Sequence, residues 1–313
     1  MKSFITIGLV LFSSLGATSA VSQEQNDFTP PKGKGIGPGR FGPWNMRLMT
    51  AVSEDGLTFK RTHQVITDQG DVPDMVVDRN GRIYLYYLGW KVGRSNNRTV
   101  LAISDDQGSS WTYKKVRLSG FKRMASPVDP DVQLLPNGTF RLYVTSDPHD
   151  GSGPRFYFAE SKDGLHFTKE GVAFQLNRGV TLDPSTLRTG RSWTLFCGGG
   201  GTRKPGANWL ATSSDGKSYT SKGEVSFRIN GDDHAVANGI EVPGGYRLYL
   251  FSHGRTPLIR SVFSRDGVKW KPDAGIRLKI DRTSGKESHG VKDPAVVRLA
   301  SGRYFMVYTT AIP

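Results

Sequence analysis

The stretch Ser161-Lys162-Asp163-Gly164-Leu165-His166-Phe167 decides the fold, because its pattern Ser-x-Asp-Gly-x-x-aromatic recurs along the whole chain. Four further copies, one of them with an extra residue, lie at 53–59, 104–111, 213–219 and 264–270. The five Asp residues, at 55, 106, 163, 215 and 266, are 51, 57, 52 and 51 positions apart. Asp and Ser side chains can cap the N–H groups of a tight turn, and Gly takes the positive φ there. The pattern therefore predicts five hairpins.

A second repeat lies between these turns and consists of a polar residue, an apolar strand, a Gly turn and an aromatic strand. Its copies begin at Asp74, Asp131, Asp183, Asn238 and Asp293. Each repeat supplies two strands, so one period of about fifty residues supplies four, as in a propeller blade. The sequence predicts an all-β, five-bladed β-propeller of four-stranded antiparallel blades. The chain starts with an outer hairpin and ends with an inner pair, so N- and C-terminal strands should close the last blade.

The N-terminus has the features of a cleavable signal peptide, residues 1–20. Lys2 supplies the charge, residues 4–15 form an apolar run too short to span a bilayer, and small residues follow at 17–20. Residues 21–40, rich in Gly, Pro and Lys, predict a flexible leader before a single propeller domain at 41–313. We expect a monomer that is secreted or periplasmic, with no membrane span.

Composition narrows the classes of partner. The formal charge is +14, but Lys and Arg are scattered and no nucleic-acid-binding motif is present, so nucleic acid is not expected. The basic surface leaves an anionic carbohydrate open as a ligand. Cys197 is the sole cysteine, which excludes an internal disulfide; it lies in a strand-like run and is expected to be buried.

The residues that start the second repeat are candidates for a functional site. In a propeller the first strand of each blade lines the central channel, so Asp74, Asp131, Asp183, Asn238 and Asp293 should meet at one mouth. Several carboxylates in one funnel raise one another's pKa and are costly to bury. Either each caps its own blade, as the Asp-Pro pairs at 129, 183 and 293 would allow, or they serve chemistry.

Other polar and aromatic residues are candidates for substrate contact. His234 and His289 each lie four residues before a repeat start, which places both on loops entering the funnel. Trp90 is a candidate for sugar stacking, and Arg155 and Arg178 for anion contact. No His-x-x-x-His or Cys pair supports a metal site, so no metal or other cofactor is expected to be required. The channel leaves room for a structural calcium ion.

The blade count and segments such as Asp183-Pro184-Ser185 and Asp293-Pro294-Ala295 resemble the five-bladed propeller glycosidases of glycoside hydrolase family 43, the arabinanases and β-xylosidases. The resemblance covers about residues 41–313. It implies an Asp base, a second Asp that tunes pKa and a Glu acid, separated by two blades and then one. Asp74, Asp183 and Glu241 reproduce that spacing. The family's Glu-Gly-Pro segment is absent, which leaves His234 or Asp233 as alternatives for the acid.

The copy at 104–111 also resembles the Asp-box of sialidases, a structural turn that carries no catalysis. A sialidase would need six blades and a cluster of three arginines, so five blades argue against that class.

Taken with the resemblance, the sequence predicts a secreted glycoside hydrolase acting on a poly- or oligosaccharide with inversion. Asp74 would activate water, Glu241 would protonate the leaving oxygen and Asp183 would hold the acid's protonation state. The alternative is a lectin-like propeller that binds carbohydrate without cutting it. A scaffold for protein partners is a third interpretation, and it predicts a flat, apolar top face.

Overall fold

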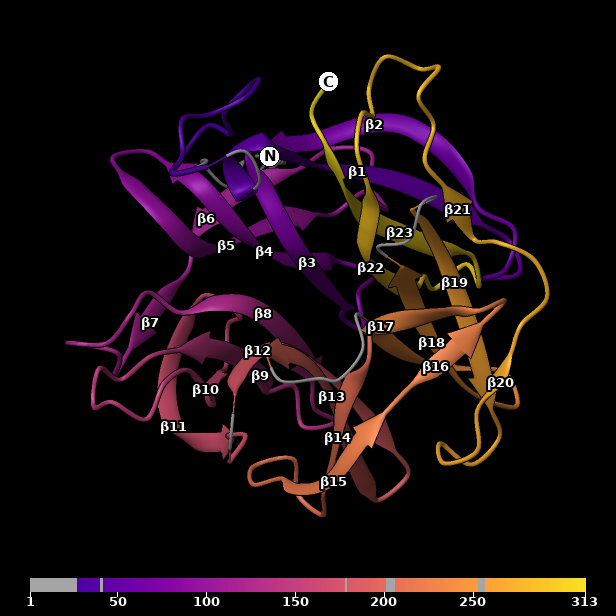
Figure 1. The fold of residues 1–313 in the computed structure, drawn as a ribbon. Coiled ribbons are helices and arrows are strands. Elements are labelled where there is room, and N and C mark those ends of the chain that lie inside the picture. Colours follow the sequence, from indigo (N-terminus) through magenta and orange to yellow (C-terminus); the bar gives the residue numbers. More distant parts are fainter. Residues whose placement is uncertain (1–26, 40–41, 178, 201–205, 253–256) are drawn as a thin grey trace, which may run out of the picture.

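The computed structural model describes residues 27–39, 42–177, 179–200, 206–252 and 257–313. In this part of the chain five β-sheets surround a central axis, each contributing its first strand to the channel (Figure 1). The predicted five-bladed propeller is therefore confirmed. The expected signal peptide and Arg178 lie outside the described residues.

Blades one to four are built from consecutive strands, with one outer strand of blade two, β7, pairing parallel to β11. Blade one contains β3 (Gly70–Val77), β4 (Ile83–Val92), β5 (Ser95–Ser104) and β6 (Thr112–Lys115). Blade two contains β8 (Val128–Leu134), β9 (Phe140–Ser146), β10 (Arg155–Ser161), β11 (His166–Phe174) and β7 (Arg117–Ser119). Blade three contains β12 (Val180–Thr189), β13 (Ser192–Gly200), β14 (Asn208–Ser213) and β15 (Thr220–Val225). Blade four contains β17 (Asp232–Val242), β18 (Gly245–Ser252) and β19 (Leu258–Ser264), flanked by β16 (Phe227–Ile229), β20 (Lys271–Pro272) and β21 (Leu278–Lys279).

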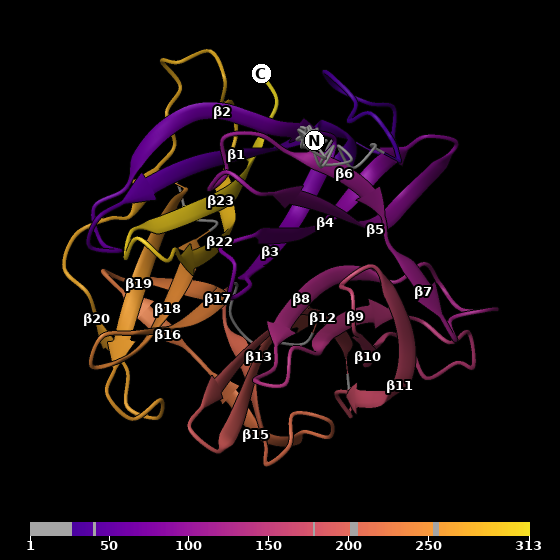
Figure 2. The same cartoon turned by 180° about the vertical axis from the view of Figure 1, so that it is seen from behind.

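Blade five joins the two ends of the chain, as the repeat order predicts. Its strand order is β22 (Val291–Arg298), β23 (Tyr304–Ala311), β1 (Met46–Ser53) and β2 (Lys60–Asp68). The junction is an eight-residue antiparallel register between β1 and β23 (Figure 2). This pairing gives each terminal strand a neighbour and so hides the sheet edges that an open ring would expose.

The repeated Ser-x-Asp-Gly turns have the local hydrogen bonds that their sequence predicts. Asp55 Oδ1 accepts a hydrogen bond from Ser53 Oγ and from the N–H groups of Leu57 and Thr58, at 2.7–2.8 Å. These bonds hold the pKa of Asp55 below its usual range. Gly56 has φ +69°, and its carbonyl accepts a 2.9 Å hydrogen bond from the buried Tyr249 hydroxyl of blade four. The turn thus also joins two blades.

Residues 27–39, within the expected flexible leader, make specific contacts with blades five and one. The Gly33 N–H donates to Asp68 Oδ2 at 2.5 Å, and Trp90 Nε1 donates to the Ile36 carbonyl at 2.9 Å. Trp44, in the 3₁₀ turn η1 (Pro43–Asn45), packs edge-on against the Trp90 ring, with centroids 4.9 Å apart. Gly37 lets the backbone of this segment pass close to the Trp44 ring, because a Cβ at this position would overlap the indole.

Apolar side chains fill the spaces between blades. One cluster joins blades five and one through Leu48, Leu85, Tyr87 and Val307, and each neighbouring pair of blades has a comparable cluster. Across the ranges given above, no helix is long and apolar enough to cross a membrane.

Candidate active site

Four inner strands have a strained bulge near their start. Val72, Asp129, Asp183 and Asp293 have φ values of +45°, +52°, +54° and +45°, and each precedes a proline. The strand register shifts at the same points in β3, β8, β12 and β22. Non-glycine residues are rarely left-handed, and such strain is concentrated at functional sites. Three of these four positions carry a carboxylate.

The three bulge carboxylates lie in one electrostatic cluster with Asp71 and Lys292. Lys292 Nζ is 2.7 Å from Asp71 Oδ1 and also contacts Asp293 Oδ2. The Lys292 side chain is only 21% exposed, and its carboxylate partners are 10% and 13% exposed. Burial alone would lower the pKa of Lys292, but its pairing with Asp293 and Asp71 outweighs burial and raises the pKa, so this lysine stays charged at neutral pH. We call Asp71, Asp129, Asp183, Lys292 and Asp293 the carboxylate funnel.

The carboxylates of the funnel differ in their surroundings. Burial, together with the charges of Asp71 and Asp293, raises the pKa of Asp129 to about 6. Burial, followed by the charges of Asp129 and Asp293, raises the pKa of Asp183 well above its ordinary value. The Asp183 side chain nevertheless reaches solvent, because the funnel is open at this mouth. Asp293, in contrast, has a direct cationic partner. A carboxyl group of raised pKa and a carboxylate paired with a lysine are therefore close enough to influence each other.

A cavity of about 580 Å³ opens beside the funnel. Asp71 and Lys292 form part of its wall, together with His289, Ser252 and residues of the N-terminal segment at Gly42 and Met46. His289 is exposed, as expected for a loop residue at the mouth. The cavity has the size typical of small-ligand sites in proteins.

Further along the inner strands, polar side chains form hydrogen bonds between neighbouring blades. Asp74 Oδ2 accepts a 2.7 Å hydrogen bond from the Val132 N–H of blade two. Asp131 accepts two bonds from Thr186 of blade three, from its N–H and its hydroxyl, at 2.9 and 2.5 Å. Asn238 Oδ1 accepts from the Val296 N–H of blade five at 3.0 Å. These residues therefore hold neighbouring blades in register.

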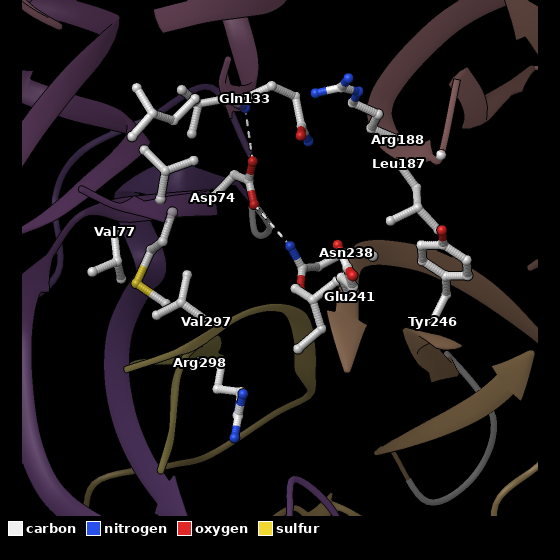
Figure 3. A pocket seen from close by; sticks show the side chains of 17 residues that line it. Asp74, Val77, Gln133, Leu187, Arg188, Asn238, Glu241, Tyr246, Val297 and Arg298 are labelled. Atoms are coloured by element: carbon white, nitrogen blue, oxygen red, sulfur yellow. Dashed lines mark hydrogen bonds between the residues drawn. The ribbon is translucent and has the colours of Figure 1, made fainter. Parts of the chain in front are cut away.

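The expected catalytic trio is split between the two ends of the channel. Asp74 and Glu241 line a second cavity, of about 530 Å³, formed where the inner strands end (Figure 3). Leu187 and Gly239 lie side by side on β12 and β17, since a Cβ at Gly239 would be 3.2 Å from that of Leu187. Asp183 lies four residues before Leu187 on β12, and Glu241 lies two residues after Gly239 on β17. At roughly 3.3 Å per residue the two acids are about 20 Å apart along the strands.

The expected substrate contacts fall into three groups. Asp293 and His289 lie at the funnel, whereas Asp131 and Asn238 form hydrogen bonds between neighbouring blades. His234 is buried, its Nδ1 lies 2.9 Å from the Asp232 carbonyl, and burial lowers its pKa.

The remaining candidates have other partners. Trp90 contacts the N-terminal segment. Arg155 pairs with Asp150 at 2.9 Å. Asp233, the alternative acid, accepts a hydrogen bond from Ser226.

Three funnel residues escaped the sequence analysis as site residues: Asp71, Asp129 and Lys292. The sequence does show an Asp-Pro pair at 129. Because the same pair recurs at 183 and 293, it could have indicated that Asp129 belongs to the site. Asp71 and Lys292 are brought together by tertiary structure alone, because they lie 221 residues apart. Within the described ranges, no group of three His, Cys, Asp or Glu side chains is placed to hold a metal ion.

The fold and the site define a five-bladed propeller with a carboxylate-lined mouth. No family model matches the chain, and no curated protein matches it. Solved structures with the same fold include an α-L-arabinofuranosidase of family 43 from Clostridium thermocellum, with a TM-score of 0.56 and 18% identity over 78% of this chain and 82% of that one. A thermostable family-43 glycoside hydrolase gives 0.59 and 14% over 77% and 88%. A glycosyl hydrolase from Bacteroides ovatus gives 0.53 and 16% over 78% and 86%. At these identities the likeness shows a shared fold.

Proposed function

We propose that the protein is an exported glycoside hydrolase that acts on a poly- or oligosaccharide at the carboxylate funnel. The observation that carries this proposal is the pairing of a carboxyl group of raised pKa, Asp183, with a lysine-bound carboxylate, Asp293, in one open mouth. Glycosidic bonds are cleaved by two carboxyl groups in opposite protonation states. The glycoside hydrolases that share the fold support the same class.

The roles follow from the environments of the three bulge carboxylates. Asp183, whose pKa is raised, would donate its proton to the leaving glycosidic oxygen. Asp293, paired with Lys292, would take a proton from the water that attacks the anomeric carbon. Asp129 would raise the pKa of Asp183 through its charge. The C–O bond breaks as the new C–O bond forms on the opposite face of the sugar, and the configuration inverts. Exchange with solvent then restores both protonation states.

This assignment keeps the blade spacing implied by the family resemblance but moves it around the ring. Asp293, Asp129 and Asp183 lie on blades five, two and three, a step of two blades followed by a step of one. Asp74 already uses both carboxylate oxygens to hold Val132 and Asn238, and Glu241 lines the second cavity, where the inner strands end. The proposal therefore uses Asp183 as the acid and Asp293 as the base.

The test is hydrolysis of a panel of aryl glycosides and natural polysaccharides by the purified protein and three variants. Asp293→Asn should lose activity on every substrate. Asp183→Asn should lose activity on polysaccharides but retain much of it on dinitrophenyl glycosides, whose leaving group needs no acid. Asp105→Asn, an exposed surface carboxylate paired with Arg82, is the matched control. NMR of the first product formed would give its anomeric configuration.

Each outcome of this test is informative. Activity that survives Asp293→Asn and Asp183→Asn, but is lost in a folded Asp74→Asn variant, would overturn the funnel assignment. Binding of a carbohydrate without release from any substrate would replace hydrolysis with the lectin-like function.

A further inference from the structure

The second cavity, which we call the rear cavity, lies at the end of the channel opposite the carboxylate funnel. The last residues of all five inner strands contribute to its wall, and its volume is about 530 Å³. Figure 3 shows polar side chains on several sides of this space, with apolar groups of Val77, Leu187 and Val297 between them. The rear cavity has the volume of a small-molecule site and mixes apolar surface with a few polar groups, as such sites do.

Two of its charged side chains lack partners. Arg188 on β12 and Glu241 on β17 are exposed at the cavity, and neither has a hydrogen bond or ion pair with any other described residue. They do not pair with each other, although their strands are neighbours in the ring. Gln133 donates through Nε2 to the Thr186 carbonyl at 3.0 Å, which leaves its amide oxygen as an acceptor. The rear cavity therefore offers donors and acceptors that a ligand can use.

The charges narrow the class of ligand. An anion would gain from Arg188 and Arg298 but would face Glu241 and Asp74. A cation would gain from the two acids but would face the two arginines. A neutral polyhydroxyl compound meets neither conflict, because its hydroxyl groups donate to a carboxylate and accept from a guanidinium. The apolar groups of Leu187, Ile240 and Val297 would contact the C–H face of a sugar ring.

We propose that the rear cavity is a second carbohydrate site, which binds a neutral mono- or disaccharide through Arg188, Glu241 and Gln133. The proposal rests on the proposed function for the choice of sugar and extends it to a binding site separate from the funnel. It gives the propeller a site at each end of its channel, one for cleavage and one for binding.

The experiment is isothermal titration of the Asp183→Asn/Asp293→Asn double variant, in which turnover is blocked, with arabinose, xylose, mannose, galactose and xylobiose. Galacturonate and glucosamine serve as anionic and cationic probes. At least one neutral sugar should bind, and adding Arg188→Leu or Glu241→Gln should each weaken its binding tenfold or more. Arg191→Leu is the matched control, because Arg191 is an exposed arginine three positions after Arg188 and does not line the rear cavity.

Three results would overturn the proposal. One is that no neutral sugar binds; another is that binding is the same in the Arg188→Leu and Glu241→Gln variants as in the parent. The third is that galacturonate or glucosamine binds in place of neutral sugars. Failure of the proposed function would look different, since binding at the rear cavity would then persist while the unmodified funnel hydrolyses no glycoside.

Discussion

The side-chain amide of Asn238 donates a 3.0 Å hydrogen bond to Asp74 Oδ1, joining blade four to blade one. The other oxygen of Asp74 accepts from the Val132 N–H of blade two, and Asn238 accepts from the Val296 N–H of blade five. These two residues thus connect four blades. Ala295 occupies the corresponding position of blade five and cannot make such a bond, so Asp74 and Asn238 carry much of the ring's closure.

The first prediction concerns this connection. Asp74→Ala would leave the Val132 N–H and the Asn238 amide buried without an acceptor, and burying unsatisfied polar groups is strongly destabilising. The free energy of unfolding should fall by about 3 kcal/mol, measured by urea titration. Glu241→Ala, which alters the same cavity but removes no hydrogen bond, should change it by less than about 0.5 kcal/mol. Equal effects would mean that the connection contributes little.

The five blades and their closure could be predicted from sequence because their determinants are local. A turn such as Ser53 to Thr58 is shaped by hydrogen bonds between residues two or three apart, so each copy is recognisable in isolation. The repeat then fixes the count of strands. The closing of blade five follows from the order of the repeats and needs no knowledge of side-chain contacts.

The site was harder to predict because the bulge in an inner strand shifts its residues relative to the sequence repeat. In the sequence, Asp74 and Asp183 occupy the same place in the repeat. In the structure, Asp183 is a left-handed bulge residue at the mouth, and its counterpart on blade one is Val72, whereas Asp74 is two residues deeper. The local sign of that shift is the proline that directly follows each bulge residue, at 73, 130, 184 and 294. The Asp71–Lys292 pair has no such local sign, since it forms only when blades five and one meet.

The second prediction is that the protein becomes more stable as the pH falls from 8 toward 5. Asp74 and Asp129 have folded pKa values of about 7 and 6, above the ordinary value of 3.8. Groups with raised pKa contribute stability that is fully present below about pH 4 and is lost as the pH rises through 6 and 7. The turn residue Asp266, with its pKa lowered to about 2, acts in the opposite direction, so stability should fall again below pH 4.

Urea titrations at a series of pH values would check this prediction. Asp129→Asn should flatten the dependence between pH 4 and 6, because the asparagine carries no titrating proton. Asp105→Asn, at the surface, should leave the curve as it is. A stability that rises steadily from pH 5 to 8 would contradict the pKa directions on which the prediction depends.

The third prediction addresses strain at Val72. A β-branched residue with φ +45° is a backbone outlier, and Asn tolerates the left-handed region far better. Val72→Asn should therefore raise the free energy of unfolding by about 1 kcal/mol. The control is Val172→Asn, at a half-exposed valine of the ordinary strand β11, which should be destabilising because Asn is unfavourable in strands. Destabilisation by both changes would show that contacts of the Val72 side chain outweigh the strain.

The fourth prediction links Lys292 to the proposed reaction. Removing its charge in Lys292→Met leaves Asp71 and Asp293 without their cation, so the pKa of the Asp293 base should rise. Because the base works only when ionised, the acidic limb of the kcat/KM profile should move to higher pH by about one unit or more, each unit corresponding to about 1.4 kcal/mol. Lys292→Arg keeps the positive charge and should shift the limb much less.

A purely structural role for Lys292 would lower activity at every pH without moving the limb, so the shape of the profile separates the two roles. Lys286→Met is the control, because that lysine donates to the His63 carbonyl at 2.6 Å, outside the carboxylate funnel, and its removal should leave the profile in place. Thermal melting would establish that each variant is folded at the pH of the assay. If a folded Lys292→Met variant kept the parent's acidic limb, Asp293 would not be the base, and Asp129 or Asp71 would have to be tested in its place.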